Sequence, residues 1–156
     1  MEKIGVKTTF AVSDADAERH PLPLVRVLIV DDSKPWRRWV YSELARQQQL
    51  QVVGEASDGL EAVRKAYELK PDIILLDIGL PHLNGLEAAS HIAQSTPDSK
   101  IVFFTAQNDP NLAKLALSNG ATGYVLKMDA KAELLAAITA VIQGCRFVSR
   151  RLAVKF

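Results

Sequence analysis

The feature that most constrains the fold is a regular alternation of short aliphatic runs with longer stretches of helical period, which begins at Val25. The first, third and fourth runs carry three or more consecutive apolar residues, as parallel strands buried on both faces do. The second and fifth runs are more mixed, which suits strands at the edges of a sheet. The predicted strands are VRVLIV (25–30), LQVVGEA (50–56), DIILLD (72–77), KIVFFT (100–105) and TGYVLK (122–127).

Helix signals follow each of these runs. Ser33 is a capping residue with Pro35 in the first turn, and Asp58 with Glu61 has the spacing of a capping box. Pro71 ends the second helical stretch. The other three helices are predicted over residues 86–94, 110–119 and 130–143, and a glycine closes each of the last two.

Alternating strand and helix units with short connections form parallel α/β sheets with right-handed crossovers. The units found here predict a flavodoxin-like, doubly wound (βα)5 fold, with a five-stranded parallel sheet of order 2-1-3-4-5. In such sheets ligands bind outside the carboxyl ends of the strands, near the point where the strand order reverses. The residues at the strand ends are therefore the candidate site.

Polar side chains occupy these strand ends. They are Asp31 and Asp32 after the first strand, Asp77 after the third, Thr105 at the end of the fourth and Lys127 at the end of the fifth. Three converging carboxylates repel one another unless a cation is present. Mg²⁺, which prefers oxygen ligands and keeps several waters, suits a small open acidic pocket.

A carboxylate at this place can also act as a nucleophile and take up a phosphoryl group as a mixed anhydride. Phosphoryl transfer needs mainly positioning and positive charge near the phosphoryl oxygens, which Mg²⁺ and the Lys127 ammonium would supply. The Thr105 hydroxyl would donate a hydrogen bond to a phosphoryl oxygen. Asp77 is thus the predicted phosphate acceptor.

Four motifs in this order and at these spacings resemble the receiver domains of two-component response regulators. They are VLIVDDS, PDIILLDIGLPHLNG, IVFFTA and GATGYVLK, and the resemblance extends from about Val25 to Gln143. It implies that a histidine kinase, a phosphotransfer protein or a small phosphodonor phosphorylates Asp77. It also implies that Asp32, Asp77 and the Gly79 carbonyl bind Mg²⁺ directly, while Asp31 acts mainly through water.

The resemblance further implies a conformational switch. Lys127 would pair with the acceptor or its phosphate, and Thr105 with Tyr124 would form a switch pair of hydroxyl and aromatic ring. Phosphorylation would then change the surface formed by residues 111–143 and its affinity for a partner or for a second copy of the chain. Enzymatic activity is expected only as self-phosphorylation from small donors and slow self-dephosphorylation.

The segment GYVLKMDA and the helix after it resemble most closely the NarL/FixJ-type subgroup, whose receivers normally precede a helix-turn-helix DNA-binding domain. We expect a flexible extension over residues 1–23, a receiver domain over 24–144, and a tail or linker remnant over 145–156. Twelve residues after Gly144 are too few for a helix-turn-helix domain. The chain is then either a stand-alone receiver or the receiver part of a truncated DNA-binding transcriptional regulator.

Two other functions were compared with a phosphorylated switch. A Mg²⁺-dependent phosphatase of the haloacid-dehalogenase kind normally carries Asp-x-Asp after its first strand, whereas Asp31 and Asp32 are adjacent here. A pseudo-receiver, which binds partners without chemistry, remains an alternative, although every acceptor-site residue is present. The chain has no G-x-x-x-x-G-K-[ST] run, which excludes a P-loop nucleotide hydrolase.

Composition sets outer bounds on partners and location. At 156 residues with 48% hydrophobic composition, the chain suits one core. The 19 basic and 18 acidic residues nearly cancel, so direct nucleic-acid binding by bulk charge is not expected. A single cysteine excludes an internal disulfide, and no signal peptide or membrane-length apolar run is found. We therefore expect a soluble, cytoplasmic protein without a membrane partner.

Overall fold

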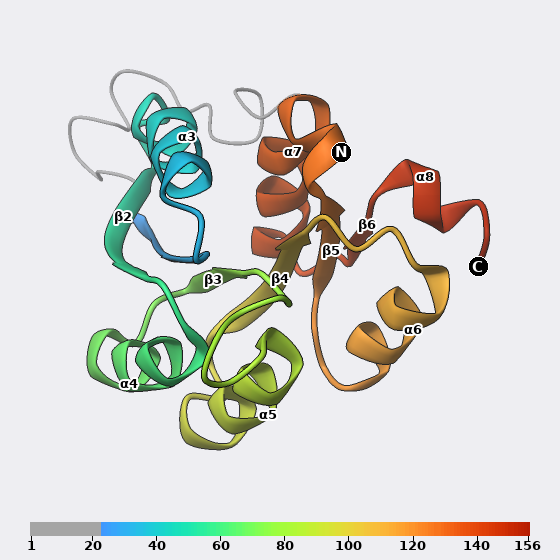
Figure 1. The fold of residues 1–156 in the computed structure, drawn as a ribbon. Helices are drawn as coiled ribbons and strands as arrows, with labels where there is room; N and C mark the ends of the chain where they lie inside the picture. Colours follow the sequence, from blue (N-terminus) through green and yellow to red (C-terminus); the bar gives the residue numbers. More distant parts are fainter. Residues whose placement is uncertain (1–22) are drawn as a thin grey trace.

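The computed structural model describes residues 23–156, and apart from its last residue the extension predicted over residues 1–23 lies outside this range. Strands and helices alternate along the chain (Figure 1). The strands are β1 (Val25–Val30), β2 (Leu50–Ala56), β3 (Ile73–Leu76), β4 (Lys100–Thr105), β5 (Gly123–Leu126) and β6 (Phe147–Val148). The helices are α3 (Lys34–Ala45), α4 (Gly59–Leu69), α5 (Gly85–Ser95), α6 (Pro110–Ser118), the 3₁₀ turn η1 (Lys127–Asp129), α7 (Ala130–Ile142) and α8 (Arg150–Ala153).

The sheet confirms the predicted parallel fold and extends it by one strand. Its order is β2-β1-β3-β4-β5-β6, and all neighbouring strands are parallel. The predicted order 2-1-3-4-5 is therefore correct. The edge position predicted for the fifth strand is wrong, because the short strand β6 pairs with β5 on its outer side.

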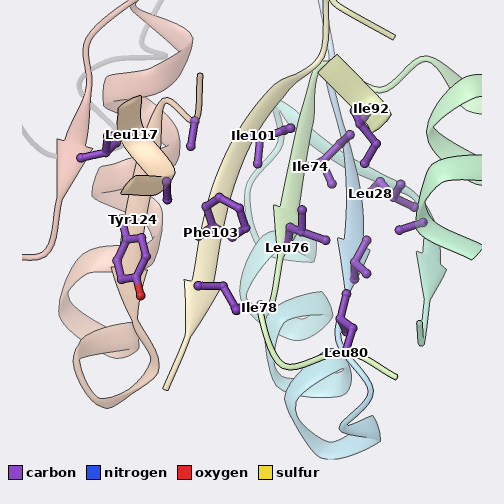
Figure 2. Close-up of a cluster of buried hydrophobic side chains, with 14 of the residues drawn as sticks. Leu28, Ile74, Leu76, Ile78, Leu80, Ile92, Ile101, Phe103, Leu117 and Tyr124 are labelled. Carbon is purple, nitrogen blue, oxygen red and sulfur yellow. The ribbon is translucent and has the colours of Figure 1, made fainter. Parts of the chain in front are cut away.

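Two apolar layers cover the two faces of the sheet. Helices α3 and α7 pack on one face, and α4, α5 and α6 cover the other (Figure 1). Figure 2 shows the second layer, in which side chains of β1, β3 and β4 meet those of the helices. Every residue of β3 is buried, as its unbroken apolar sequence predicts. A strand buried on both faces is a rigid support for the residue that follows it.

The helices begin where the sequence predicts. The Ser33 side chain accepts a hydrogen bond from the Trp36 amide, and Asp58 accepts one from the Glu61 amide at 2.8 Å. Glu61 in turn accepts from the amide of Ser57, the residue before the N-cap, at 2.8 Å, so the predicted pair of caps forms with its return bond shifted by one residue. Among the helices of residues 23–156, none is long and apolar enough to cross a membrane.

Part of the segment predicted as a tail or linker remnant, residues 145–156, is folded against the rest of the protein. Residues 147–153 form β6 and α8, and Ser149 and Leu152 are fully buried. Arg150 and Arg151 remain exposed. The apolar side chains of Phe147, Val148 and Leu152 pack against the two apolar layers, whereas the basic side chains of the same segment face solvent.

Candidate functional site

Three carboxylates meet at the carboxyl edge of the sheet. Asp31 and Asp32 follow β1, and Asp77 follows β3, its neighbour in the sheet. One carboxylate oxygen from each lies within 4.8 Å of the others. Asp31 and Asp77 are buried, whereas Asp32 is exposed to solvent. The convergence predicted from the strand ends is thus present in the structure, with one open side.

Lys127, at the end of β5, neutralises part of this charge. Its Nζ lies 2.7 Å from Asp31 Oδ2 and 2.9 Å from Asp77 Oδ2. Burial acts to lower the pKa of Lys127, but the hydrogen bonds and charges of Asp31 and Asp77 prevail and raise it. The ammonium also lies 5.2 Å from the centre of the Trp36 ring, at a cation–π distance.

Asp31 is held by the main chain and by Lys127. Its Oδ1 accepts a hydrogen bond from the Ser33 amide at 2.9 Å, and its Oδ2 is paired with the Lys127 ammonium at 2.7 Å. Burial raises the pKa of Asp31, and Lys127 offsets only part of this effect. Three converging carboxylates, one of them exposed, fit a divalent cation with oxygen ligands.

The loop after Asp77 is held closely by main-chain contacts. Asp77 Oδ1 accepts a hydrogen bond from the Ile78 amide at 2.7 Å, and the Gly85 amide donates to the Ile78 carbonyl at 2.7 Å. A Cβ atom at Gly85 would lie 2.0 Å from the Asp77 carbonyl oxygen, so only glycine fits there. Gly79, two residues beyond Asp77, is exposed, and no atom lies within 4 Å of the place of a Cβ.

Thr105 and Tyr124 are joined through the main chain of Gln107. The Gln107 amide donates to Thr105 Oγ1 at 3.3 Å, and the Tyr124 hydroxyl donates to the Gln107 carbonyl at 2.8 Å. The Tyr124 ring lies beside Phe103, and its hydroxyl points toward the carboxyl end of the sheet (Figure 2). Burial raises the pKa of Tyr124, so its hydroxyl stays protonated and a donor.

The site contains features that the sequence motifs do not indicate. Gln107 contributes main-chain atoms, and such contacts leave no signature in residue type. The cation–π contact of Trp36 is foreshadowed only by its closeness in sequence to Asp31 and Asp32. Asp31 is in direct contact with Lys127, a pairing that the motifs do not indicate.

Comparisons with known proteins identify the family. Residues 27–139 match the response regulator receiver domain. The response regulator GacA of Pseudomonas viridiflava is 42% identical over 131 residues, which are 83% of this chain and 61% of GacA. The transcriptional regulatory protein LiaR of Bacillus subtilis is 38% identical over 121 residues, 78% of this chain and 57% of LiaR. The chain therefore spans only part of the length of these curated relatives.

A solved structure agrees in both sequence and fold. The crystal structure of a two-component response regulator of the LuxR family, from Aurantimonas sp. SI85-9A1, superposes with a TM-score of 0.80 at 37% identity. The alignment covers 84% of this chain and 94% of that one. These relatives fit the predicted NarL/FixJ-type subgroup. The chain belongs to the response regulator receiver domain family of two-component systems.

Proposed function

We propose that this chain is a phosphorylation-dependent signalling switch that accepts a phosphoryl group on Asp77. The carrying observation is that the Lys127 ammonium bridges Asp31 and Asp77 beside the exposed Asp32. Asp77 is the buried nucleophile, Lys127 supplies positive charge, and Asp32 lies on the side open to a donor. Receiver domains of response regulators are signalling proteins, and a histidine kinase phosphorylates them.

The proposed reaction is a simple displacement at phosphorus. One carboxylate oxygen of Asp77 forms a bond to the donor phosphorus, and the bond from phosphorus to the donor breaks. With acetyl phosphate the leaving group is acetate, which departs with the bonding electron pair. With a phosphohistidine the leaving group is the imidazole nitrogen. The product is an aspartyl phosphate whose charge Lys127 and Thr105 would help to stabilise.

Receiver domains generally bind Mg²⁺ in an acidic pocket, and this cluster fits such an ion. We propose that Asp31, Asp32, Asp77 and the Gly79 carbonyl hold it, Asp31 mainly through water. When bound, Mg²⁺ would neutralise charge on the phosphoryl oxygens and orient the donor. The convergence of the three carboxylates and the open Asp32 side of the cluster support this assignment.

The proposed response to phosphorylation uses Thr105 and Tyr124. The Thr105 hydroxyl would leave its contact with the Gln107 amide and bind a phosphoryl oxygen, and the Tyr124 ring would repack behind it. Such a two-state element changes the surface of α6, β5 and α7. We propose a histidine kinase or a phosphotransfer protein as the upstream partner, and a partner protein or a second copy of this chain downstream.

The test is the intact mass of the protein after incubation with acetyl phosphate, with and without Mg²⁺. We expect a gain of one phosphoryl group that requires Mg²⁺ and is lost in Asp77→Asn. The matched control is Asp98→Asn, which changes an exposed aspartate outside the site. It should be labelled like the unchanged protein.

Continued labelling of Asp77→Asn at full stoichiometry would refute Asp77 as the acceptor. An absence of labelling in the unchanged protein under all conditions would favour the pseudo-receiver, a binding module with this fold but without phosphate chemistry.

A further inference from the structure

The segment Phe147–Ala153, here called the latch, lies against the strand that carries the response residues. Val148 pairs with Tyr124 in the sheet, and the Phe147 amide donates to the Thr122 carbonyl at 3.1 Å. The Ser149 amide donates to the Tyr124 carbonyl at 2.9 Å. Figure 1 shows the latch at the outer edge of the sheet, beyond β5. The main chain of Tyr124 therefore cannot shift without altering its contacts with the latch.

Ser149 fastens the latch to both β5 and α7. Its buried hydroxyl accepts a hydrogen bond from the Leu126 amide at 2.8 Å and donates one to Glu133 Oε1 at 2.6 Å. The other oxygen of Glu133 accepts from the Arg150 amide at 3.1 Å. Leu126 directly precedes Lys127, so the latch holds the chain one residue from the active-site ammonium.

The other side of the latch closes on α6. Leu152 is fully buried in the same apolar cluster as Ala113, Leu117 and Tyr124, and α8 contacts α6. The latch thus covers part of the face formed by α6, β5 and α7, the surface expected to change on phosphorylation.

A single 3₁₀ turn links the active site to the latch. Lys127 stands at the start of η1 and contacts Asp31 and Asp77. Asp129, at the end of the same turn, forms a two-pronged ion pair with Arg151, with contacts of 2.9 and 3.2 Å. The three residues of η1 therefore connect the Lys127 ammonium at the candidate site with the Arg151 guanidinium of α8.

We propose that the latch is an intramolecular cover of the α6–β5–α7 face, and that phosphorylation of Asp77 loosens it. This inference rests on the proposed function. A phosphoryl group at Asp77 adds negative charge beside Lys127, which is now shared between two carboxylates. Lys127 turns toward the new charge, η1 follows it, and the contacts of Asp129 and the Leu126 amide with the latch weaken. Repacking of Tyr124 disturbs the main-chain bonds to Val148 and Ser149.

The experiment is hydrogen exchange of backbone amides in the whole chain, with and without acetyl phosphate and Mg²⁺. Intact mass measures the phosphorylated fraction in the same samples. We expect the exchange of the Ser149, Leu152 and Ala153 amides to become about tenfold faster on phosphorylation, because their protection reports local opening. Amides of β1 and β3 should keep their protection.

Two variants in α8 provide a matched pair. Leu152→Ala removes the buried contact, so exchange in the latch should already be fast without a phosphodonor and should increase little on phosphorylation. Val154→Ala truncates an exposed side chain next to the same helix and should exchange like the unchanged protein. Both variants should still gain one phosphoryl group, because neither residue touches the acceptor site.

The outcomes separate the two proposals. A protein that gains the phosphoryl group but keeps its latch protection unchanged would overturn the latch and leave the proposed function standing. Failure of Leu152→Ala to speed exchange in the latch would also overturn it. A protein that gains no phosphoryl group would overturn both proposals.

Discussion

Strands β3 and β5 both end at the candidate site, yet they are held in very different ways. β3 carries Asp77 and pairs along its whole length with β1 on one side and β4 on the other. β5 carries Tyr124 and leads to Lys127, and its outer neighbour is the two-residue strand β6. The proposed acceptor thus follows a strand that is paired on both sides along its whole length, whereas the proposed response residues lie on or directly after a strand whose outer partner is short.

The difference in strand pairing matches the different tasks proposed for the two strands, phosphoryl transfer at the end of β3 and a conformational response at β5. A phosphate acceptor benefits from a fixed position, because phosphoryl transfer depends on alignment. A switch needs two arrangements that differ by only a few kcal/mol. Individual hydrogen bonds contribute about 1 kcal/mol each, so the few contacts between β5 and β6 can exchange at modest cost. We therefore expect substitutions on the β3 side to disrupt the loop that holds Asp77, and those on the β5 side to alter the proposed response as well as the stability.

The largest effect is expected for Gly85→Ala on the β3 side. The new Cβ would lie 2.0 Å from the Asp77 carbonyl oxygen and 2.6 Å from Ile78 Cα. Because these are main-chain atoms, no side-chain rotation relieves the clash. We expect the free energy of unfolding to fall by about 3 kcal/mol, as measured by urea denaturation.

Gly79→Ala is the control for this prediction. It lies in the same loop, but no atom lies within 4 Å of the place of its Cβ. Its effect should stay below about 1 kcal/mol. Equal destabilisation by the two substitutions would mean that the loop shifts to accommodate the new Cβ. The rigid support inferred for Asp77 would then be wrong.

The substitution Lys127→Ala tests the comparison of the two strands on the β5 side. It leaves the buried Asp31 and Asp77 without their shared cation. Because the Asp32 side of the cluster is open to solvent, we expect the free energy of unfolding to fall by about 2 kcal/mol in the absence of Mg²⁺. A divalent cation can neutralise the same carboxylates, so Mg²⁺ should restore much of this loss. Thermal unfolding with and without Mg²⁺ measures both effects.

Lys131→Ala, an exposed lysine at the start of α7, should lose little stability and gain no additional response to Mg²⁺. If Mg²⁺ stabilised Lys127→Ala no more than the unchanged protein, the carboxylates would not form its binding site. In the phosphorylated Lys127→Ala variant, the change in the α6–β5–α7 face should be weaker than in the unchanged protein.

Much of the fold and of the acidic site was predictable because the signals are local. The aliphatic runs predict the central strands, and Ser33 and Asp58 predict two helix starts that the structure confirms. The meeting of Asp31, Asp77 and Lys127 follows from the rule that parallel strands end at one edge.

The parts that escaped prediction depend on contacts between distant segments. Strand β6 has two residues, too few to show a period. Ser149 follows this strand, and its hydroxyl accepts a hydrogen bond from the Leu126 amide, 23 positions away in the sequence. The link between Thr105 and Tyr124 uses main-chain atoms of Gln107, which any residue type offers. Such contacts depend on tertiary geometry, and sequence pattern does not encode them.

The smallest predicted effect concerns acid stability on the β3 side, where the start of α4 supports the acceptor loop. The Gly59 amide donates to the Pro81 carbonyl, and His82 Nδ1 lies 3.2 Å from Asp58 Oδ2. The hydrogen bond from the Glu61 amide lowers the pKa of Asp58 below its ordinary value of 3.8. The bond from the Ser57 amide lowers the pKa of Glu61 below 4.5.

Because both folded-state pKa values lie below the unfolded ones, the unfolded chain binds more protons at acid pH. The stabilisation is present above the ordinary values of 3.8 and 4.5 and is lost as the pH falls through the folded-state values. Asp58→Asn keeps a good capping residue but no longer titrates at this position, so its free energy of unfolding should fall less steeply below pH 3.8 than that of the unchanged protein.

Burial raises the pKa of Asp31 and gives a pH dependence of opposite sign, but this contribution is common to both proteins and cancels in the difference. Urea denaturation across this pH range measures how steeply the free energy of unfolding falls with pH in the two proteins. Identical slopes would mean that the Asp58 charge does not stabilise the contact between the start of α4 and the acceptor loop.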